Sequence, residues 1–200
     1  MSSHYSTLEI FYHAGTYPTA TLEKLSIASL YREIDGESAR FKSETLFALL
    51  VDANLGISKT MIDLWQFFAE RQIPRFLLVQ GYESSESDFD DMVLIANRVL
   101  EKMATPYLII HNETGEAAGL VDLKNMKVRS YLSGGISEED CDESLIDLID
   151  DFRSEYIDEF VNLGSSAFSS GLYPIAVPIG SKLPVGINEL NQIIGELTKR

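Results

Sequence analysis

The hydrophobic pattern between residues 45 and 89 predicts a strand, a helix and a second strand in succession. Residues 46–51 form an unbroken apolar run, which is typical of a strand covered on both faces of a parallel sheet. Ser58 is a candidate N-cap, and the helical face that follows it consists of Met61, Ile62, Trp65, Phe68 and Ala69. Pro74 ends this helix, because the residue before a proline avoids the α region. Residues 75–79 then read as a second buried strand.

The flanking segments continue this alternation. Residues 7–14 alternate and predict a strand, and a helix is expected after Thr19 with the apolar stripe Leu22, Leu25, Ala28 and Tyr31. Residues 35–43 form a polar link. Ser87 or Asp88 is expected to cap another helix, whose buried side is Met92, Ile95, Ala96, Val99 and Met103. Residues 107–110 predict a further strand.

The pattern changes from residue 112 onward. Residues 118–123 and 127–132 predict a small hairpin, and a long acidic helix is expected to open at Ser137. Residues 173–179 predict a last strand, followed by a closing helix through Leu190 and Leu197. The expected fold is therefore a single α/β domain over residues 1–200. It has a mostly parallel sheet, helices on both faces and a hairpin-plus-helix insertion at about 112–171.

The composition argues against several classes of function, including nucleic-acid binding and metal binding. The chain has 31 acidic and 16 basic residues, and its formal net charge of −15 argues against an extended nucleic-acid-binding surface. It has no apolar run of membrane-spanning length and no visible secretory signal, so a cytoplasmic protein without membrane contact is expected. Cys141 is the only cysteine, and His4, His13 and His111 are scattered, so neither a disulfide nor a metal site is expected.

Polar residues follow the two central strands where those strands end. Asp52 and Asn54 come after the first, and Gln80 and Glu83 come at the end of the second. In open α/β sheets ligands bind beyond the carboxyl ends of the strands, so this edge is the candidate binding site.

The order of these pieces resembles the G domain of translational GTPases, and elongation factor G in particular. The resemblance covers residues 45–197. It rests on Val51-Asp52-Ala53 with Gly56 after it, on residues 80–83 in the position of the NKxD motif with Asp88-Phe89 after them, and on two later segments. Residues 118–123 (AGLVDL) resemble the GxVDL turn of the insertion in elongation factor G, and residues 174–183 resemble the closing segment of that domain. The resemblance implies a P-loop-NTPase-like G domain.

The phosphate loop implied by the resemblance is degenerate. A loop of the form GxxxxGKS or GxxxxGKT is expected between the first strand and helix, and the matching positions here give Gly15, Thr16, Thr19 and Thr21 as vestigial phosphate-loop residues. Thr21 occupies the lysine position, and Pro18 removes one N–H donor. Loss of the lysine alone corresponds to about tenfold to a hundredfold weaker binding.

The other motifs are lost to different degrees. The γ-phosphate-sensing DxxG motif is absent from the sequence, and the switch region is shortened to the link before residue 45. Hydrolysis by the family mechanism is therefore not expected, and no catalytic residue is assigned. Gln80, Glu83, Ser181 and Lys182 occupy the guanine-reading positions and are vestigial guanine-reading residues.

Three functions stay open. The first is a degenerate elongation factor G-like domain that acts as a binding or regulatory module, with no cofactor. The second is a divergent GTPase that keeps weak binding of GTP or GDP with magnesium. The third is an acidic protein-interaction module with only fold-level likeness to GTPases. The expected partner is another protein or further domains of the same protein, and the resemblance adds the ribosome.

Overall fold

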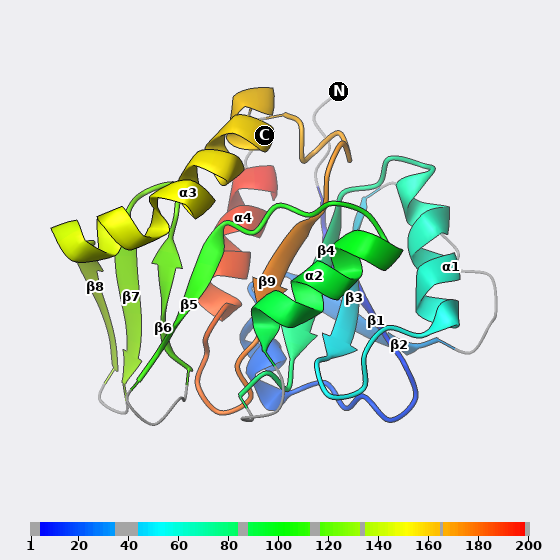
Figure 1. Ribbon diagram of the computed structural model, residues 1–200. Helices are drawn as coiled ribbons and strands as arrows, with labels where there is room; N and C mark the ends of the chain where they lie inside the picture. Colours follow the sequence, from blue (N-terminus) through cyan, green and yellow to red (C-terminus); the bar gives the residue numbers. More distant parts are fainter. Residues whose placement is uncertain are drawn as a thin grey trace.

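The computed structural model describes residues 5–34, 44–83, 88–112, 117–132, 135–164 and 166–198, which form two sheets with helices packed around them (Figure 1). The first is a five-stranded parallel sheet in the order β2-β1-β3-β4-β9. Its strands are β1 (Thr7–Tyr12), β2 (Ala28–Glu33), β3 (Thr45–Asp52), β4 (Arg75–Gln80) and β9 (Ile175–Pro178). This arrangement is compatible with Rossmann-like and P-loop-like α/β folds.

The second sheet is antiparallel, with four strands in the order β5-β6-β7-β8. Its strands are β5 (Tyr107–His111), β6 (Ala117–Asp122), β7 (Lys127–Leu132) and β8 (Gly135–Asp140). The helices are α1 (Lys59–Ala69), α2 (Phe89–Val99), α3 (Glu143–Glu159) and α4 (Ile187–Thr198), with short 3-10 helices η1 (Ala20–Lys24) and η2 (Val161–Leu163).

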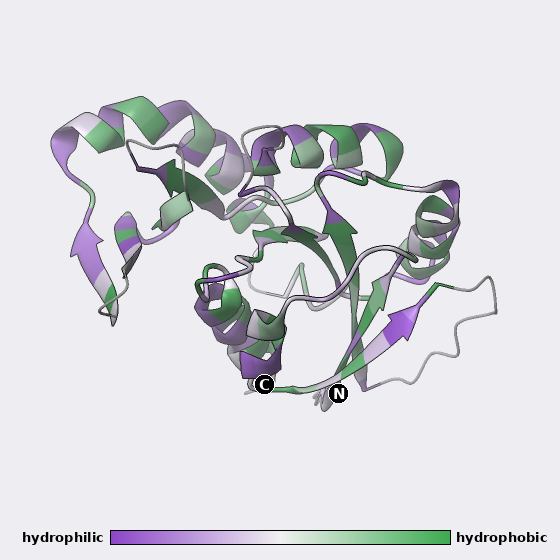
Figure 2. Ribbon diagram, turned by 90° about the horizontal axis from the view of Figure 1, so that it is seen from below, coloured by the Kyte–Doolittle hydropathy of each residue, from purple (hydrophilic) through white to green (hydrophobic). Residues whose placement is uncertain are grey.

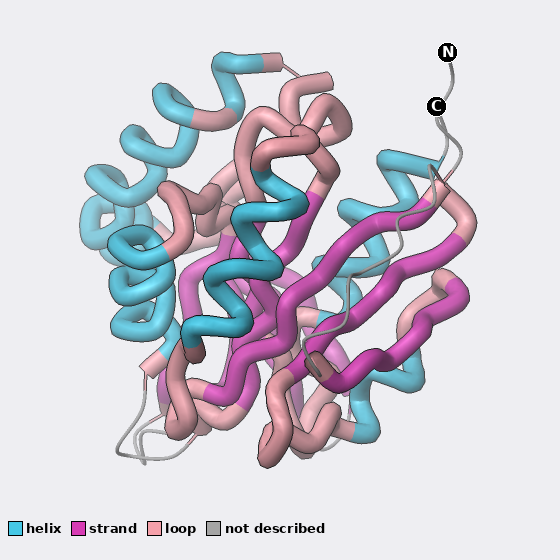
Figure 3. The backbone as a smooth tube through the Cα atoms, turned by 90° about the vertical axis from the view of Figure 1, so that its right-hand side faces the viewer, coloured by secondary structure: helices cyan, strands magenta, loops and turns pink. Residues whose placement is uncertain are grey.

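Helices cover both faces of the parallel sheet, as Figure 3 shows from the side. The alternation of β3 explains the layering: Leu46, Ala48 and Leu50 face η1 and α4, whereas Phe47, Leu49 and Val51 face α1 and α2. The predicted central strands and the caps are confirmed, since Ser58 caps α1 and Asp88 caps α2. Ser87, the alternative cap, lies outside the described residues.

The antiparallel sheet is also covered on both faces. One face, with Leu120 and Tyr131, packs against Ile193 of α4, and the other, with Val121, packs against Ile149 of α3. In Figure 1, α3 lies across one end of this sheet and α4 lies between the two sheets. The outer strand β8 is exposed along its whole length and hydrophilic, in contrast to the hydrophobic central strands of the parallel sheet (Figure 2).

The helix predicted after Thr19 is wrong beyond Lys24. Residues 20–24 form η1, Leu25 has extended backbone angles, and Ala28 to Glu33 form β2. β2 pairs in parallel with β1 along its whole length, so long-range ladder hydrogen bonds override the helical spacing of Ala28 and Tyr31. The predicted polar link at residues 35–43 lies outside the described residues.

Two predictions about the second half of the chain are also wrong. The strand at 107–110, expected in the parallel sheet, is β5 and pairs antiparallel with β6, so the second sheet begins before residue 112. The acidic helix does not open at Ser137, because residues 135–140 form β8 and α3 begins at Glu143 with Asp142 as its N-cap. β8 pairs with β7, and ion pairs cross between them from Lys127 to Asp140 and from Arg129 to Glu138.

A buried carboxylate fastens the second sheet to α4. Glu189, near the start of α4, is 1% exposed and accepts hydrogen bonds from the Tyr131 hydroxyl at 2.7 Å to each carboxylate oxygen. Arg129 of β7 also forms an ion pair with Glu189. α4 therefore packs against both sheets, and a charged contact holds it to the second one. Among the described residues, no helix combines the length and apolar character needed to cross a membrane.

Candidate functional site

The carboxyl ends of four parallel strands meet at one edge of the first sheet. We call this the carboxyl edge: the ends of β1, β3, β4 and β9 together with residues 13–21, 52–56, 80–83 and 179–186 that follow them. The carboxyl edge contains all eight predicted site residues. Backbone hydrogen bonds join its loops, from Ala53 N to Gln80 O at 2.8 Å and from Ile179 N to Val79 O at 2.7 Å.

Two hydroxyl groups of the vestigial phosphate loop, those of Thr19 and Thr21, are bonded within the protein. Thr21 Oγ1 donates to the backbone oxygen of Gly180 at 2.6 Å and lies 2.7 Å from Thr19 Oγ1. Thr16 is buried, and its N–H donates to His13 O at 2.9 Å, whereas Gly15 is exposed with φ of 93°. The loop leads into the five-residue 3-10 helix η1 and not into an α-helix. It therefore lacks the aligned helix N-terminus that binds phosphate in P-loop proteins.

Gln80 holds the middle of the carboxyl edge. Its side chain is buried, and Nε2 donates to Tyr17 O at 2.9 Å and, more weakly, to Asp52 Oδ2 at 3.4 Å. Both partners are acceptors, which sets the orientation of the amide. Gln80 Oε1 is buried and has no hydrogen-bond partner in the described part of the chain. The same holds for the hydroxyl of Tyr82, whose pKa is raised by burial and then by the adjacent Glu83 carboxylate.

Two of the vestigial guanine-reading residues contact each other. The Glu83 carboxylate accepts hydrogen bonds from Ser181 N, at 3.2 Å to each oxygen, and from Ser181 Oγ. Both residues occupy guanine-reading positions in the resemblance, and here the donors of Ser181 satisfy the Glu83 carboxylate. Lys182 is exposed, and within the described residues its side chain forms no ion pair.

Gly81 shows why a longer side chain does not fit at its position. It has φ of 76°, and a Cβ built on it would lie 2.6 Å from Asp52 Oδ1. Asn54 closes this corner, because its Nδ2 donates to Asp52 Oδ1 at 3.1 Å and to Gly81 O at 2.9 Å. Gly81 stands at the lysine position of the NKxD motif in the resemblance, and the Asp52 carboxylate occupies the space where such a side chain would begin.

The electrostatics of the carboxyl edge oppose a polyanion. Asp52 and Glu83 bring two carboxylates to it, and Lys182 is the one cationic side chain among the eight predicted residues. The described residues contain no group of three or more metal-ligating side chains. A triphosphate would meet negative charge here without an arranged counter-charge.

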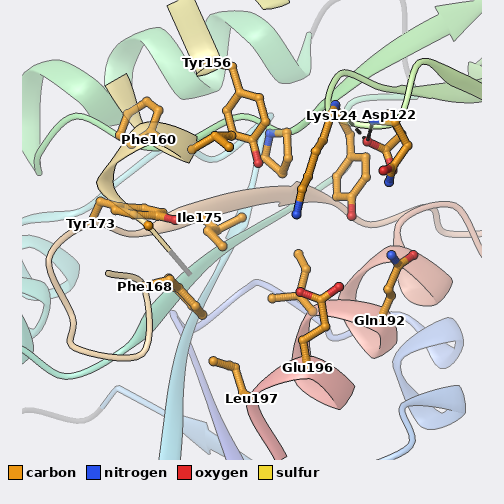
Figure 4. Close-up of a pocket in the computed structure, with 16 residues that line it drawn as sticks. Asp122, Lys124, Tyr156, Phe160, Phe168, Tyr173, Ile175, Gln192, Glu196 and Leu197 are labelled. Atoms are coloured by element: carbon orange, nitrogen blue, oxygen red, sulfur yellow. Dashed lines mark hydrogen bonds between the residues drawn. The ribbon is translucent and has the colours of Figure 1, made fainter. Parts of the chain in front are cut away.

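A separate cavity, which the sequence did not predict, lies at the other end of β9. It has a volume of about 340 Å³ and is lined by residues of β5, β6, α3, β9, α4 and the loops beside them. Figure 4 shows the aromatic side chains of Tyr156, Phe160 and Tyr173 around it. The lining residues come from separate segments with no common spacing, so no sequence motif could have marked them.

Comparisons with known proteins define the fold and leave the family open. No protein-family model matches the sequence, and no curated protein matches it. Among solved structures, the chain is similar to the crystal structure of the protein ttk003000868 from Thermus thermophilus, with a TM-score of 0.65 and 17% sequence identity. The match covers 76% of this chain and 26% of that protein, so the chain spans about a quarter of its length.

Proposed function

We propose that this chain is a degenerate relative of the elongation factor G nucleotide domain, unable to hydrolyse GTP, that serves as a binding or regulatory module. The observation that carries the proposal is the contact between Glu83 and Ser181, two residues that the resemblance assigns to guanine recognition. The parallel sheet and the order of the loops support the scaffold, and the bonding within the carboxyl edge supports the loss of nucleotide chemistry.

Guanine binding at this edge would first cost existing hydrogen bonds. The bonds from Ser181 N and Oγ to the Glu83 carboxylate must break before either group can meet a base. Hydrogen bonds to a charged group contribute about 1.5–3 kcal/mol each, so a base would have to replace contacts of similar strength. The net gain from guanine is therefore small.

The vestigial phosphate loop offers no binding free energy to offset this cost. Thr21 stands at the lysine position, and its hydroxyl already donates to Gly180 O. The 3-10 helix η1 offers no α-helical N-terminus, and no DxxG sequence is present to hold a water or a metal ion near a γ-phosphate. We expect the scaffold to be retained for contacts made by its surface.

Isothermal titration with GTP and GDP in the presence of magnesium tests this proposal. The expected result is no binding at micromolar concentration and no phosphate release. The double variant Ala20→Gly with Thr21→Lys restores the lysine and serves as a gain-of-function comparison, which we expect to raise affinity without turnover. Micromolar binding with turnover by the wild-type chain would overturn the proposal.

A nucleotide-binding alternative has one observation in its favour. Gln80 is one of the guanine-reading residues, and its Oε1 is a buried acceptor without a partner in the described part of the chain. A divergent GTPase would use Gly15, Thr16, Thr19, Gln80 and Glu83 for weak binding. Saturable GTP binding that Glu83→Ala abolishes would favour this alternative, and binding that this substitution leaves unchanged would remove it.

The acidic-module alternative rests on α3 and β8. Between residues 135 and 163 the chain has eleven acidic residues and one basic residue, Arg153. Two large apolar side chains, Leu148 and Phe152, are 74% and 57% exposed on this surface. A basic partner protein would then bind through charge and a small apolar patch. Salt-sensitive capture of a partner, lost when Asp147 and Asp151 are changed to lysine, would favour this alternative.

A further inference from the structure

The cavity between the two sheets is a different site from the carboxyl edge. Ile175, at the start of β9, lines the cavity, whereas Gly180 and Ser181 follow the end of the same strand at the carboxyl edge. The two sites therefore lie at opposite ends of β9. At about 340 Å³, the cavity falls within the range of about 300–1,000 Å³ that is typical of small-molecule sites.

The inner wall of the cavity is a chain of aromatic rings. The ring centroid of Tyr173 lies 5.1 Å from that of Phe160 and 5.9 Å from that of Phe168, and Tyr156 lies 6.4 Å from Phe160. The rings are tilted against one another, and each is a lining residue of the cavity. This wall offers an apolar, aromatic surface to the flat body of a ligand.

Opposite charges face each other across the mouth of the cavity. Lys124 follows β6 and Glu196 lies on α4, and both are exposed. Figure 4 shows their charged groups pointing into the cavity from opposite sides. In the described part of the chain, neither one forms an ion pair. Lys124 and Glu196 are therefore a cation and an anion without an ion-pair partner among the described residues, and the Asp122 carboxylate adds a second negative charge beside Lys124.

The other polar groups at the cavity differ in how far they are already used. Asp122 accepts hydrogen bonds from Lys124 N at 2.9 Å, Asn125 N at 3.0 Å and Asn125 Nδ2 at 2.7 Å, so its carboxylate holds the turn. The Tyr156 hydroxyl points into the cavity (Figure 4). Burial, then the nearby Tyr173, raises the pKa of Tyr156, so its hydroxyl stays protonated and can donate.

We propose that this cavity binds a small zwitterion with an aromatic body, in the class of a free aromatic amino acid. Its carboxylate faces Lys124, its ammonium group faces Glu196, and its ring lies on the wall formed by Tyr156, Phe160 and Tyr173. A ligand with only a positive charge would leave Lys124 repelling it, and a ligand with only a negative charge would face Glu196 in the same way. A zwitterion satisfies both.

Ligand-detected NMR and titration calorimetry with L-phenylalanine test the proposal. Two matched probes each lack one charge: 3-phenylpropionate has no ammonium group, and 2-phenylethylamine has no carboxylate. We expect phenylalanine to bind about tenfold more tightly than either, because each missing charge removes one charge-assisted contact. Tyr156→Phe should weaken binding by a smaller factor than loss of either charge.

Two variants test which side chain contacts each charge of the ligand. Lys124→Met should remove the advantage of phenylalanine over 2-phenylethylamine, and Glu196→Gln should remove its advantage over 3-phenylpropionate. Lys59→Met and Glu70→Gln change exposed charges outside the cavity and should leave all three affinities unchanged. Because Lys124 and Glu196 are exposed, both cavity variants should fold, which circular dichroism verifies.

Three results would overturn the proposal. The first is no binding of phenylalanine at millimolar concentration. The second is equal affinity for the three probes, which would show apolar binding only. The third is coupling between Lys124→Met and Glu196→Gln in unfolding experiments without ligand, which would show that these two side chains pair with each other in solution. None of these results depends on whether GTP binds the carboxyl edge.

Discussion

Glu83, Ser181, Thr21 and Gln80 Nε2 at the carboxyl edge form hydrogen bonds within the protein, whereas Lys124 and Glu196 at the cavity between the sheets form no ion pair among the described residues. Glu83 meets Ser181, and Thr21 meets Gly180, at the edge that the resemblance marks as a nucleotide site. Lys124 and Glu196 point toward each other across the cavity (Figure 4), and in the described part of the chain they form no ion pair. A ligand at the carboxyl edge must replace existing bonds, but a ligand in the cavity supplies missing ones.

Among substitutions at the carboxyl edge, the largest change in the free energy of unfolding is expected at Gly186, in the loop between β9 and α4. It has φ of 80°, and an added Cβ would lie 1.6 Å from Pro178 O. Gly186→Ala should lower the free energy of unfolding by about 3 kcal/mol or more, because backbone must move and the new side chain disfavours this φ. Urea unfolding measures the change.

The matched control is Gly195 in α4, where an added Cβ meets nothing within 4 Å. Gly195→Ala should raise stability by up to about 1 kcal/mol through helix propensity. A Gly186→Ala variant as stable as this control would show that the loop is loose, and the carboxyl edge would then be open to rearrangement around a ligand.

A smaller effect is expected at Thr21. Thr21→Val keeps the shape of the side chain but leaves Gly180 O without its 2.6 Å partner, which should lower the free energy of unfolding by about 1–3 kcal/mol. Thr21→Ser keeps the hydroxyl and should recover most of this loss. Thermal unfolding of the two variants side by side measures the difference. If valine and serine behave alike, the hydroxyl contact does not stabilise the carboxyl edge.

The smallest effect is expected in the pH dependence of the stability of the first turn of α3, the helix that supplies Tyr156 to the cavity. Hydrogen bonds from Ser144 Oγ and from Leu145 N hold the pKa of the Asp142 carboxyl below its usual value of 3.8. The folded pKa is thus lower than the unfolded pKa. The ionised Asp142 carboxylate therefore stabilises the folded state at pH values above its unfolded pKa. This stabilisation is lost as the pH falls through its folded pKa.

Helicity measured by circular dichroism should therefore show slight fraying of α3 below about pH 4. Asp142→Asn keeps an N-cap but has no carboxyl group to titrate, so this part of the acid response should disappear. An unchanged acid response in that variant would assign the fraying to other carboxylates.

Much of the parallel sheet could be predicted from sequence because its signals are local. The apolar run at 46–51, the Ser58 cap and Pro74 each act on their own neighbourhood, and the structure confirms the elements that they predict. The edge strands β2 and β8 could not be predicted in this way. Their residues are mostly exposed, so they carry no buried face to mark them in the sequence. Pairing decides their conformation: β2 pairs with β1, 21 positions earlier, and β8 pairs with the preceding strand β7.

The sequence predicted where the candidate site lies, but it did not predict which hydrogen bonds its side chains form. The resemblance placed residues from three loops together, and the structure brings them to one edge of the sheet. Whether they bond to a ligand or to one another depends on distances between Thr21 and Gly180 or between Glu83 and Ser181, which are 159 and 98 positions apart in the chain. Sequence patterns carry no information about such distances. The cavity, assembled from separate segments, left no pattern at all.

The place of α4 has a consequence for how the molecule can be divided. Leu190 and Ile194 belong to the core under the parallel sheet, while Ile193 and Glu189 on the same helix hold the antiparallel sheet. A truncation that ends before residue 187 would remove α4 and so uncover one face of each sheet at once. In native-state hydrogen exchange, the slowest amides of β4 and β6 should open with the same free energy, as expected for a single cooperative folding unit.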